Sequence, residues 1–179
     1  NCIDTSARVV AAAAERLRRF ANVEVREGDM HALPFPDGSF DLVVLMHALT
    51  YAAKPAQAVA EAARVLKRGG RLLLSSLAKH EHRAVVEAYG HVNLGFGGKD
   101  LRKFVDKAGL SIVGCETVTR ENRPPHFEVI SLMGTKPRNS CRGSIRLASP
   151  TFGPPLLDIS RCALSSVETK PMPSPSPLM

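Results

Sequence analysis

The architecture of this chain is set by GD at residues 28–29, LPFPDGSFD at 33–41 and RVLKRGG at 64–70. The first stretch reads as the acidic end of a strand, and the second as a turn that leads into a buried strand. The third reads as a helix stopped by a glycine pair before another strand. Helices that alternate with buried strands in this way predict an α/β sheet.

The neighbouring residues extend this pattern in both directions. Apolar residues at helical spacing predict helices at about 10–20, 55–66, 83–89 and 101–108. A nearly continuous apolar run at 40–46 predicts a strand that flanking helices bury on both faces. We expect a mostly parallel sheet whose strands end at Asp4, Gly28, Met46 and Leu77, and then an antiparallel pair at 110–119 and 127–135.

The composition changes at about residue 138. From there to residue 179 the chain is rich in proline and serine and has no periodic apolar pattern. Such a segment cannot bury enough apolar surface to offset the entropy lost when its chain is ordered. We therefore expect a partial domain at 1–137 and a disordered tail at 138–179, which is either a natural linker or read-through in a shifted frame.

Charge and composition exclude several kinds of partner. The formal net charge is +7, but the basic residues are divided between the tail and helix faces, which disfavours a nucleic-acid surface. No apolar run is long enough to predict a transmembrane helix. The four cysteines form no C-x-x-C pair, and His80 and His82 alone are too few ligands for zinc. We expect a reduced, cytoplasmic protein without a metal.

The order and spacing of the quoted stretches resemble those of the class I S-adenosylmethionine-dependent methyltransferases, in their small-molecule, type-11-like branch. This resemblance implies a doubly wound, mostly parallel Rossmann-like sheet and S-adenosylmethionine as the cofactor. It implies that Asp4 binds the ribose, that Asp29 accepts from the adenine amino group and that Met30 contacts the adenine ring. The alternative for Asp4 is a helix N-cap before a helix that starts near Ser6.

The same resemblance places Met46 and His47 beside the transferable methyl group. A sulfonium donor needs little acid catalysis, because its leaving group is a neutral thioether, so the enzyme mainly aligns the acceptor and can remove its proton. His47 is the candidate for that base. The alternative is a histidine that only packs at the end of a strand.

The strand and glycine-rich loop with which this fold opens do not occur in the sequence. We therefore expect a chain truncated at its amino end, with a gap between the strands that end at Asp4 and Met46, and weak cofactor binding. The expected function is methyl transfer to a small-molecule acceptor. The alternative is a non-catalytic remnant or a ligand-sensing effector domain of a regulator.

Residues 78–96 also resemble methyltransferase domains that follow winged-helix repressors of the arsenic-sensing type. This second resemblance implies a winged-helix DNA-binding domain as a partner in the full-length protein.

Overall fold

The structure is a computed structural model that describes residues 1–122 and 125–138. The predicted tail, residues 138–179, lies outside the described residues except for Arg138. Along the chain the elements are β1 Cys2–Asp4, α1 Ala7–Leu17, β2 Val25–Glu27, β3 Phe40–Met46, the short 3₁₀ helix η1 Ala48–Tyr51, α2 Pro55–Val65, β4 Leu66–Leu77, α3 Arg83–Tyr89, α4 Gly98–Lys107, β5 Ser111–Arg120 and β6 Glu128–Thr135.

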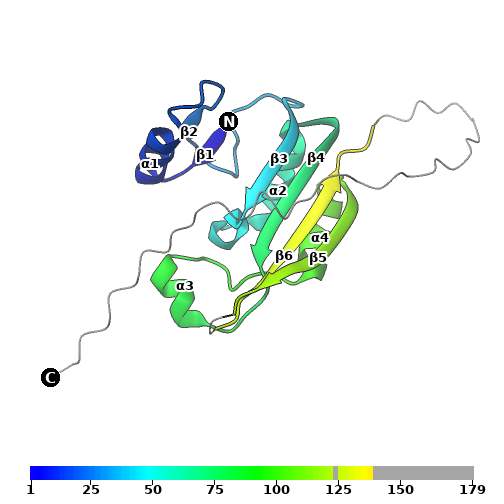
Figure 1. The fold of residues 1–179 in the computed structure, drawn as a ribbon. Coiled ribbons are helices and arrows are strands. Elements are labelled where there is room, and N and C mark those ends of the chain that lie inside the picture. The colour runs from blue at the N-terminus through cyan, green and yellow to red at the C-terminus, as the bar shows by residue number, and fades with distance from the viewer. Residues whose placement is uncertain (123–124, 139–179) are drawn as a thin grey trace, which may run out of the picture. The chain divides into compact units, whose positions relative to one another are not determined.

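The strands form two sheets, which are drawn in Figure 1. In the first, β1 pairs with β2 in parallel. The second has the order β3-β4-β6-β5, in which β3 and β4 are parallel and the other two pairs are antiparallel. The predicted α/β class and the closing antiparallel pair of β5 and β6 are therefore confirmed. The predicted parallel strands occur as two separate parallel pairs, β1 with β2 and β3 with β4, and not as one sheet.

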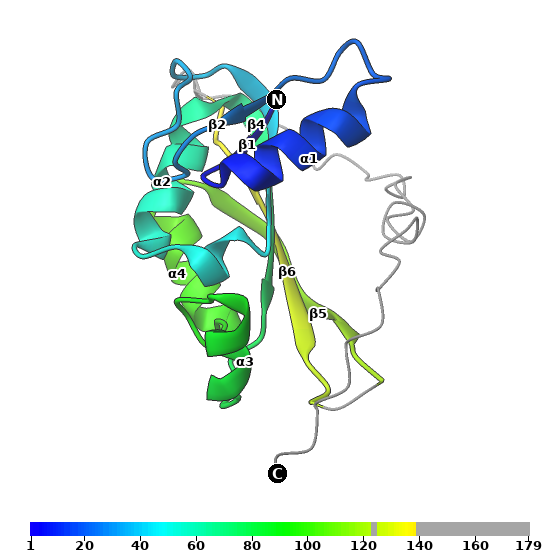
Figure 2. The ribbon, with the colours of Figure 1, turned by 90° about the vertical axis from the view of Figure 1, so that its left-hand side faces the viewer.

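The core lies on one face of the four-stranded sheet. In Figure 2, α2 and α4 lie together on one side of β4 and β6. The apolar stripes of both helices are buried there against β4 and β6, because burial of apolar surface is the main favourable term in folding. The fully buried large side chains include Leu49, Val59, Leu66, Leu72, Leu74, Leu101, Val105 and Leu132.

The opposite face of β3 is open. Leu42, Val44 and Met46 are 56%, 44% and 61% exposed, whereas Leu45 between them belongs to the core. The sequence predicted a strand buried on both faces, and this is wrong for the described structure because helices cover one face only. The alternation arises because successive side chains of a strand point to opposite faces.

The turn from α2 into β4 also differs from the prediction. The helix ends at Val65, before the glycine pair, and Leu66 already pairs with Phe40. Residues 67–70 then form an irregularity, after which Leu42 pairs with Arg71. Gly69 has a φ of +79° and sits inside this irregularity, so the glycines shape the start of β4 and do not stop the helix.

A gap separates β1 from β3, as predicted. Among the described residues, no strand pairs with β1 on the side away from β2, and none pairs with β3 on the side away from β4. Both neighbouring edges therefore keep backbone donors and acceptors that no described strand satisfies. The cavity described next lies between them.

Candidate cofactor site between β1 and β3

A cavity of about 770 Å³ separates the two sheets. Residues 1–6 and parts of the segment 28–35 form one wall, and β3, Ala48 and Tyr51 form the other. Both β1 and β3 end beside the cavity, at Asp4 and Met46. Ligands of doubly wound α/β proteins bind outside the carboxyl ends of the strands, so this cavity is the candidate ligand site.

Asp4 lines the cavity at the end of β1. One of its carboxylate oxygens accepts a hydrogen bond from the backbone N–H of Ser6 at 2.8 Å. The N-cap of α1 is Ser6, whose hydroxyl accepts from the N–H of Val9 at 3.5 Å. The alternative that Asp4 is the helix cap is therefore wrong, and its carboxylate lies on the cavity wall.

Asp29, unlike its two neighbours in the chain, does not line the cavity. Gly28 and Met30 line the cavity, but Asp29 is not part of the lining. Its carboxylate accepts from the backbone N–H of His31 at 2.8 Å and lies 2.7 Å from the ring Nδ1 of the same residue. These hydrogen bonds from His31 lower the pKa of Asp29. No pattern in the sequence indicated this role of His31.

Met30 and Met46 face the cavity from opposite walls. Gly28 holds the segment that carries Met30 close to β1, because the N–H of Gly28 donates to the carbonyl of Asp4 at 3.0 Å. A Cβ at Gly28 would approach Ile3 to 2.9 Å, a distance that real side chains do not reach. The glycine of the GD pair is thus required for the close approach of β1 and the loop after β2.

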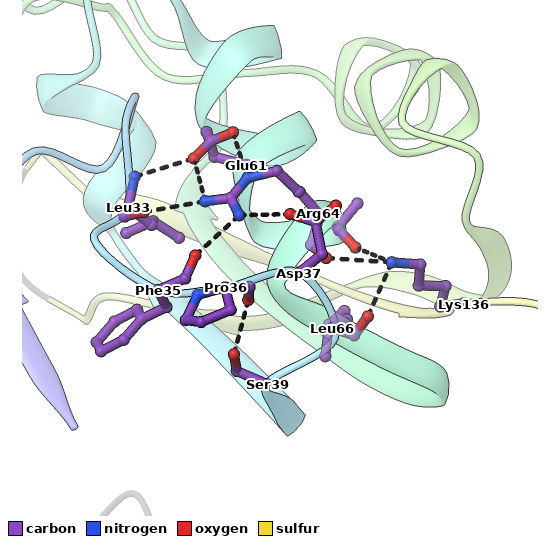
Figure 3. A network of polar contacts seen from close by, with 10 residues as sticks. Leu33, Phe35, Pro36, Asp37, Ser39, Glu61, Arg64, Leu66 and Lys136 are labelled. Atoms are coloured by element: carbon purple, nitrogen blue, oxygen red, sulfur yellow. Dashed lines mark hydrogen bonds and ion pairs between the residues drawn. The ribbon is translucent and has the colours of Figure 1, made fainter.

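Arg64 holds the loop that follows Met30, as Figure 3 shows. Its guanidinium donates to Glu61, to Asp37 and to the carbonyls of Leu33 and Phe35, at 2.7–2.9 Å. The hydrogen bonds to Glu61 and Asp37 raise the pKa of Arg64, and the same contact lowers the pKa of Glu61. This network explains why LPFPDG and RVL occur together: the helix supplies the donor that fixes the loop.

His47 follows β3 directly and has a left-handed backbone, with a φ of 52°. Such a conformation is uncommon for a residue other than glycine and marks a position held by its surroundings. Its N–H donates to Ser75 at 2.8 Å, and its carbonyl accepts from the hydroxyl of Thr50 at 2.5 Å. Burial lowers the pKa of His47, and the charge of nearby His91 lowers it further. His47 is not part of the cavity lining, but Met46 and Ala48 on either side are.

Among residues 1–122 and 125–138, no group of three or more His, Cys, Asp or Glu side chains is arranged to hold a metal ion. No helix in the same part of the chain is both long and apolar enough to cross a membrane.

Comparison with known proteins bears on this site. Residues 1–74, which contain β1, β3 and all the residues that line the cavity, match the family described as Methyltransferase domain. A ubiquinone/menaquinone biosynthesis C-methyltransferase from Pseudoalteromonas translucida is 38% identical over 68 residues, which are 38% of this chain and 27% of that protein. An uncharacterized 37.1 kDa protein in a transposon of Streptomyces fradiae is 47% identical over 72 residues, 40% of this chain and 21% of that protein.

A solved structure extends the likeness to most of the described residues. The YcgJ protein from Bacillus subtilis superposes with a TM-score of 0.61 at 18% identity, over 76% of this chain and 81% of that one. The fold is that of the Rossmann-like methyltransferases. The chain spans only 21% and 27% of the two curated relatives above.

The residues present fit S-adenosylmethionine in composition. A carboxylate on the cavity wall, Asp4, matches the need of a ribose for a hydrogen-bond acceptor. Apolar side chains on the same wall, including Met30, Leu33 and Phe35, match the need of a flat base for apolar contact.

Proposed function

We propose that this chain contributes the donor-binding site of an S-adenosylmethionine-dependent methyltransferase that acts on a small-molecule acceptor. The observation that carries the proposal is the cavity at the carboxyl ends of β1 and β3, with Asp4, Met30 and Met46 on its walls. The match of residues 1–74 to a methyltransferase family supports it.

The role of each residue follows from its place. Asp4 accepts hydrogen bonds from the ribose hydroxyls, and Met30 packs against the base. Asp29, beside Met30, accepts from the adenine amino group, a role that requires its carboxylate to share its oxygens with His31. S-adenosylmethionine supplies an electrophilic methyl group on a sulfonium. His47, whose pKa is lowered, is neutral near pH 7 and can take a proton from the acceptor.

We further propose that donor binding by the chain as it stands is weak. The cavity is bounded on one side by unpaired strand edges and by exposed apolar side chains of β3. A ligand there gains fewer contacts than in a closed pocket, which buries most of a ligand of this size. Titration with S-adenosylhomocysteine should therefore give an affinity weaker than micromolar, and a micromolar affinity would contradict this point.

A cross-linking experiment tests the donor site even when binding is weak. Ultraviolet irradiation with radiolabelled S-adenosylmethionine should label peptides from residues 1–46. Asp4→Ala should weaken donor binding by about 1–3 kcal/mol, because the ribose hydroxyls lose a charged acceptor. The matched control is Glu15→Ala, an exposed carboxylate of α1 that forms an ion pair with Arg18. Labelling that is unchanged in Asp4→Ala, or confined to residues beyond 46, would contradict the assignment.

Three finer points stay predictions. The small-molecule acceptor is tested by a mass-shift screen of candidate metabolites, in which methyl groups found only on nucleic acid would contradict it. The alternative of a ligand-sensing effector domain with a winged-helix partner predicts binding of donor and ligand without turnover. Cytoplasmic localisation is likewise a prediction that fractionation tests.

A further inference from the structure

The short helix η1 exposes one aromatic side chain between fully buried neighbours. Leu49 and Thr50 are 0% and 1% exposed, and Ala52, just after the helix, is 0% exposed. Tyr51 between them is 49% exposed and lines the cavity. The backbone of η1 therefore presents the ring of Tyr51 to the candidate donor site and not to the core.

The backbone on both sides of Tyr51 is fixed by hydrogen bonds. The side-chain amide of Asn93 donates to the carbonyls of Leu49 and Ala52, at 3.0 and 2.8 Å. The backbone N–H groups of Val92 and Asn93 both donate to the carbonyl of Thr50, at 2.9 and 3.0 Å. Because the backbone that carries the ring is ordered before a ligand arrives, a ligand that contacts Tyr51 loses less free energy to ordering.

The connection between β4 and α4, residues 78–97, supplies these bonds and is itself fixed to the sheet. The N–H of Phe96 donates to the carbonyl of Leu77, the last residue of β4, at 2.9 Å. The N–H of His80 donates to the carbonyl of Leu94 at 2.9 Å. The position of η1 is thus tied to the four-stranded sheet through two sets of backbone bonds.

The ring of Tyr51 has a face that its aromatic neighbour His91 does not cover. The rings of His91 and Tyr51 are 4.9 Å apart between centroids, and their planes are at 89°. A perpendicular contact of this kind covers at most one face of the tyrosine ring. Since Tyr51 is half exposed and lines the cavity, a ligand in the cavity can reach the ring.

The other two aromatic rings of the cavity wall differ from Tyr51 in place and in contacts. Phe35 and Phe40 pack edge to face at 4.8 Å, and the guanidinium of Arg26 lies over the ring of Phe35 at 4.9 Å. Phe40 begins β3, about 20 Å along the strand from Met46. Tyr51 follows the carboxyl end of β3, where Met46 marks the expected place of the methyl group.

The charge of the donor gives this ring a task. The sulfur of S-adenosylmethionine is a permanent cation, whereas that of S-adenosylhomocysteine, the product, is a neutral thioether. The face of an aromatic ring attracts a cation that lies within about 6 Å of the ring centroid, and a neutral thioether gains no such attraction. Of the residues that line the cavity just after β3, Ala48 offers only a methyl group, and Tyr51 offers a ring.

We propose that the ring face of Tyr51 contacts the sulfonium of the donor, so that the cavity prefers S-adenosylmethionine to S-adenosylhomocysteine. This inference rests on the proposed function and adds a residue that determines specificity at the same site. Its consequence is that the product binds less tightly than the donor and leaves the cavity more readily.

The test titrates the whole chain with three compounds that differ only at sulfur: S-adenosylmethionine, S-adenosylhomocysteine and the sulfoxide of S-adenosylhomocysteine, which has a third substituent on sulfur but no net charge there. NMR follows the tyrosine ring signals and suits weak binding. The chain has two tyrosines, so the variant Tyr89→Leu assigns the signals of Tyr51. S-adenosylmethionine should shift these signals saturably and bind about threefold or more tighter than both neutral compounds. Equal affinities for the three compounds would overturn the proposal.

Substitutions at Tyr51 locate the contact. Tyr51→Leu should lower the affinity for S-adenosylmethionine about threefold or more and change that for S-adenosylhomocysteine by less than about twofold. Tyr51→Phe keeps a ring face and should keep the preference. The control is Tyr89→Leu, which removes a tyrosine of α3 that is 57% exposed and does not line the cavity.

A preference for S-adenosylmethionine that folded Tyr51→Leu retains would refute the contact. If Tyr51→Leu does not fold, the unaltered chain decides. Larger shifts of the Tyr51 ring signals with S-adenosylmethionine than with its sulfoxide analogue then support the contact, and equal shifts overturn it.

The same titrations separate this inference from the proposed function. If all three compounds bind with equal affinity, the donor site stands and the role of Tyr51 is wrong. If none of them binds at millimolar concentration, the donor site itself is wrong, and the inference fails with it.

Discussion

At the scale of single residues, Arg64 holds one wall of the site in place through five hydrogen bonds. It joins α2 to the loop that carries Leu33 and Phe35, two residues of the cavity wall. Its side chain is 30% exposed, so its bonds are partly screened by water. Arg64→Met should still lower the free energy of unfolding by about 2–3 kcal/mol, because it leaves two backbone carbonyls and Glu61 without their donor.

Urea denaturation measures this effect, and Arg68→Met is the control. Arg68 is exposed and follows in the same basic stretch, so its replacement should change stability by less than about 0.5 kcal/mol. If both variants lose the same stability, the hydrogen bonds of Figure 3 contribute no more than the loss of one positive charge from the surface does.

Single residues of the site were only partly predictable from the sequence. The residue types and spacing suffice to place Asp4 at the end of a strand, because a strand end is a local feature. The partner of Asp29 was not predictable, since His31 reaches the carboxylate through a tight local turn. Asn93 was missed for a different reason: it bonds to residues 41 and 44 positions away, and periodicity carries no information on such contacts.

At the scale of elements, two glycines with nearly the same φ angle have different surroundings. Gly95 and Gly109 have φ angles of +76° and +75°. A Cβ at Gly109 meets nothing within 4 Å, whereas one at Gly95 collides with backbone atoms of residues 77 and 78. The pair therefore separates backbone strain from steric collision.

Gly109→Ala should lower the free energy of unfolding by about 1–2 kcal/mol, the cost of a left-handed backbone at a residue with a Cβ. Gly95→Ala should cost about 1–3 kcal/mol more, since backbone must also shift. Hydrogen exchange gives a second measurement: the amides of His80 and Phe96 should lose protection in Gly95→Ala alone. Equal stability losses in the two variants would show that residues 78–97 are less firmly attached than their hydrogen bonds indicate.

The elements themselves were largely predictable, and their boundaries less so. Strands β3, β5 and β6 were predicted correctly because runs rich in apolar and β-branched residues are local signals. The start of β4 was misplaced, because RVLKRGG looks like a helix that stops at glycine. In the structure, the ammonium of Lys136 donates to the carbonyls of Ala63, Arg64 and Leu66. These bonds satisfy carbonyls at the end of α2, so the helix can end before the glycine pair.

At the scale of the whole molecule, the gap between the two sheets explains why one half of the site is well built and the other is open. The four-stranded sheet has a closed core with α2 and α4, while β1 and β2 carry only α1 and part of the cavity wall. The residues of α1 are not buried. Stability should therefore depend mainly on the second sheet and on the helices packed against it.

Two histidines, His47 and His80, make this stability depend on pH. In the fold, the pKa of His47 and of His80 lies below the ordinary value of 6.5, mainly because burial disfavours the charged ring, and nearby imidazoles, His91 for both and His82 for His80, add to it. As the pH falls through 6.5, the unfolded chain therefore binds these protons before the folded chain does. The free energy of unfolding should fall with falling pH in this range and level off only below the lowered pKa values.

Urea denaturation between about pH 8 and about pH 5.5 measures this dependence. The range stays above the ordinary pKa values of Asp29 and Glu61, 3.8 and 4.5, whose own stabilisation is lost only at lower pH. The double variant His47→Gln/His80→Gln should show a much flatter pH profile, because glutamine does not titrate. A parent chain whose stability is constant over this range would mean that these two rings are as well solvated in the fold as in the unfolded chain.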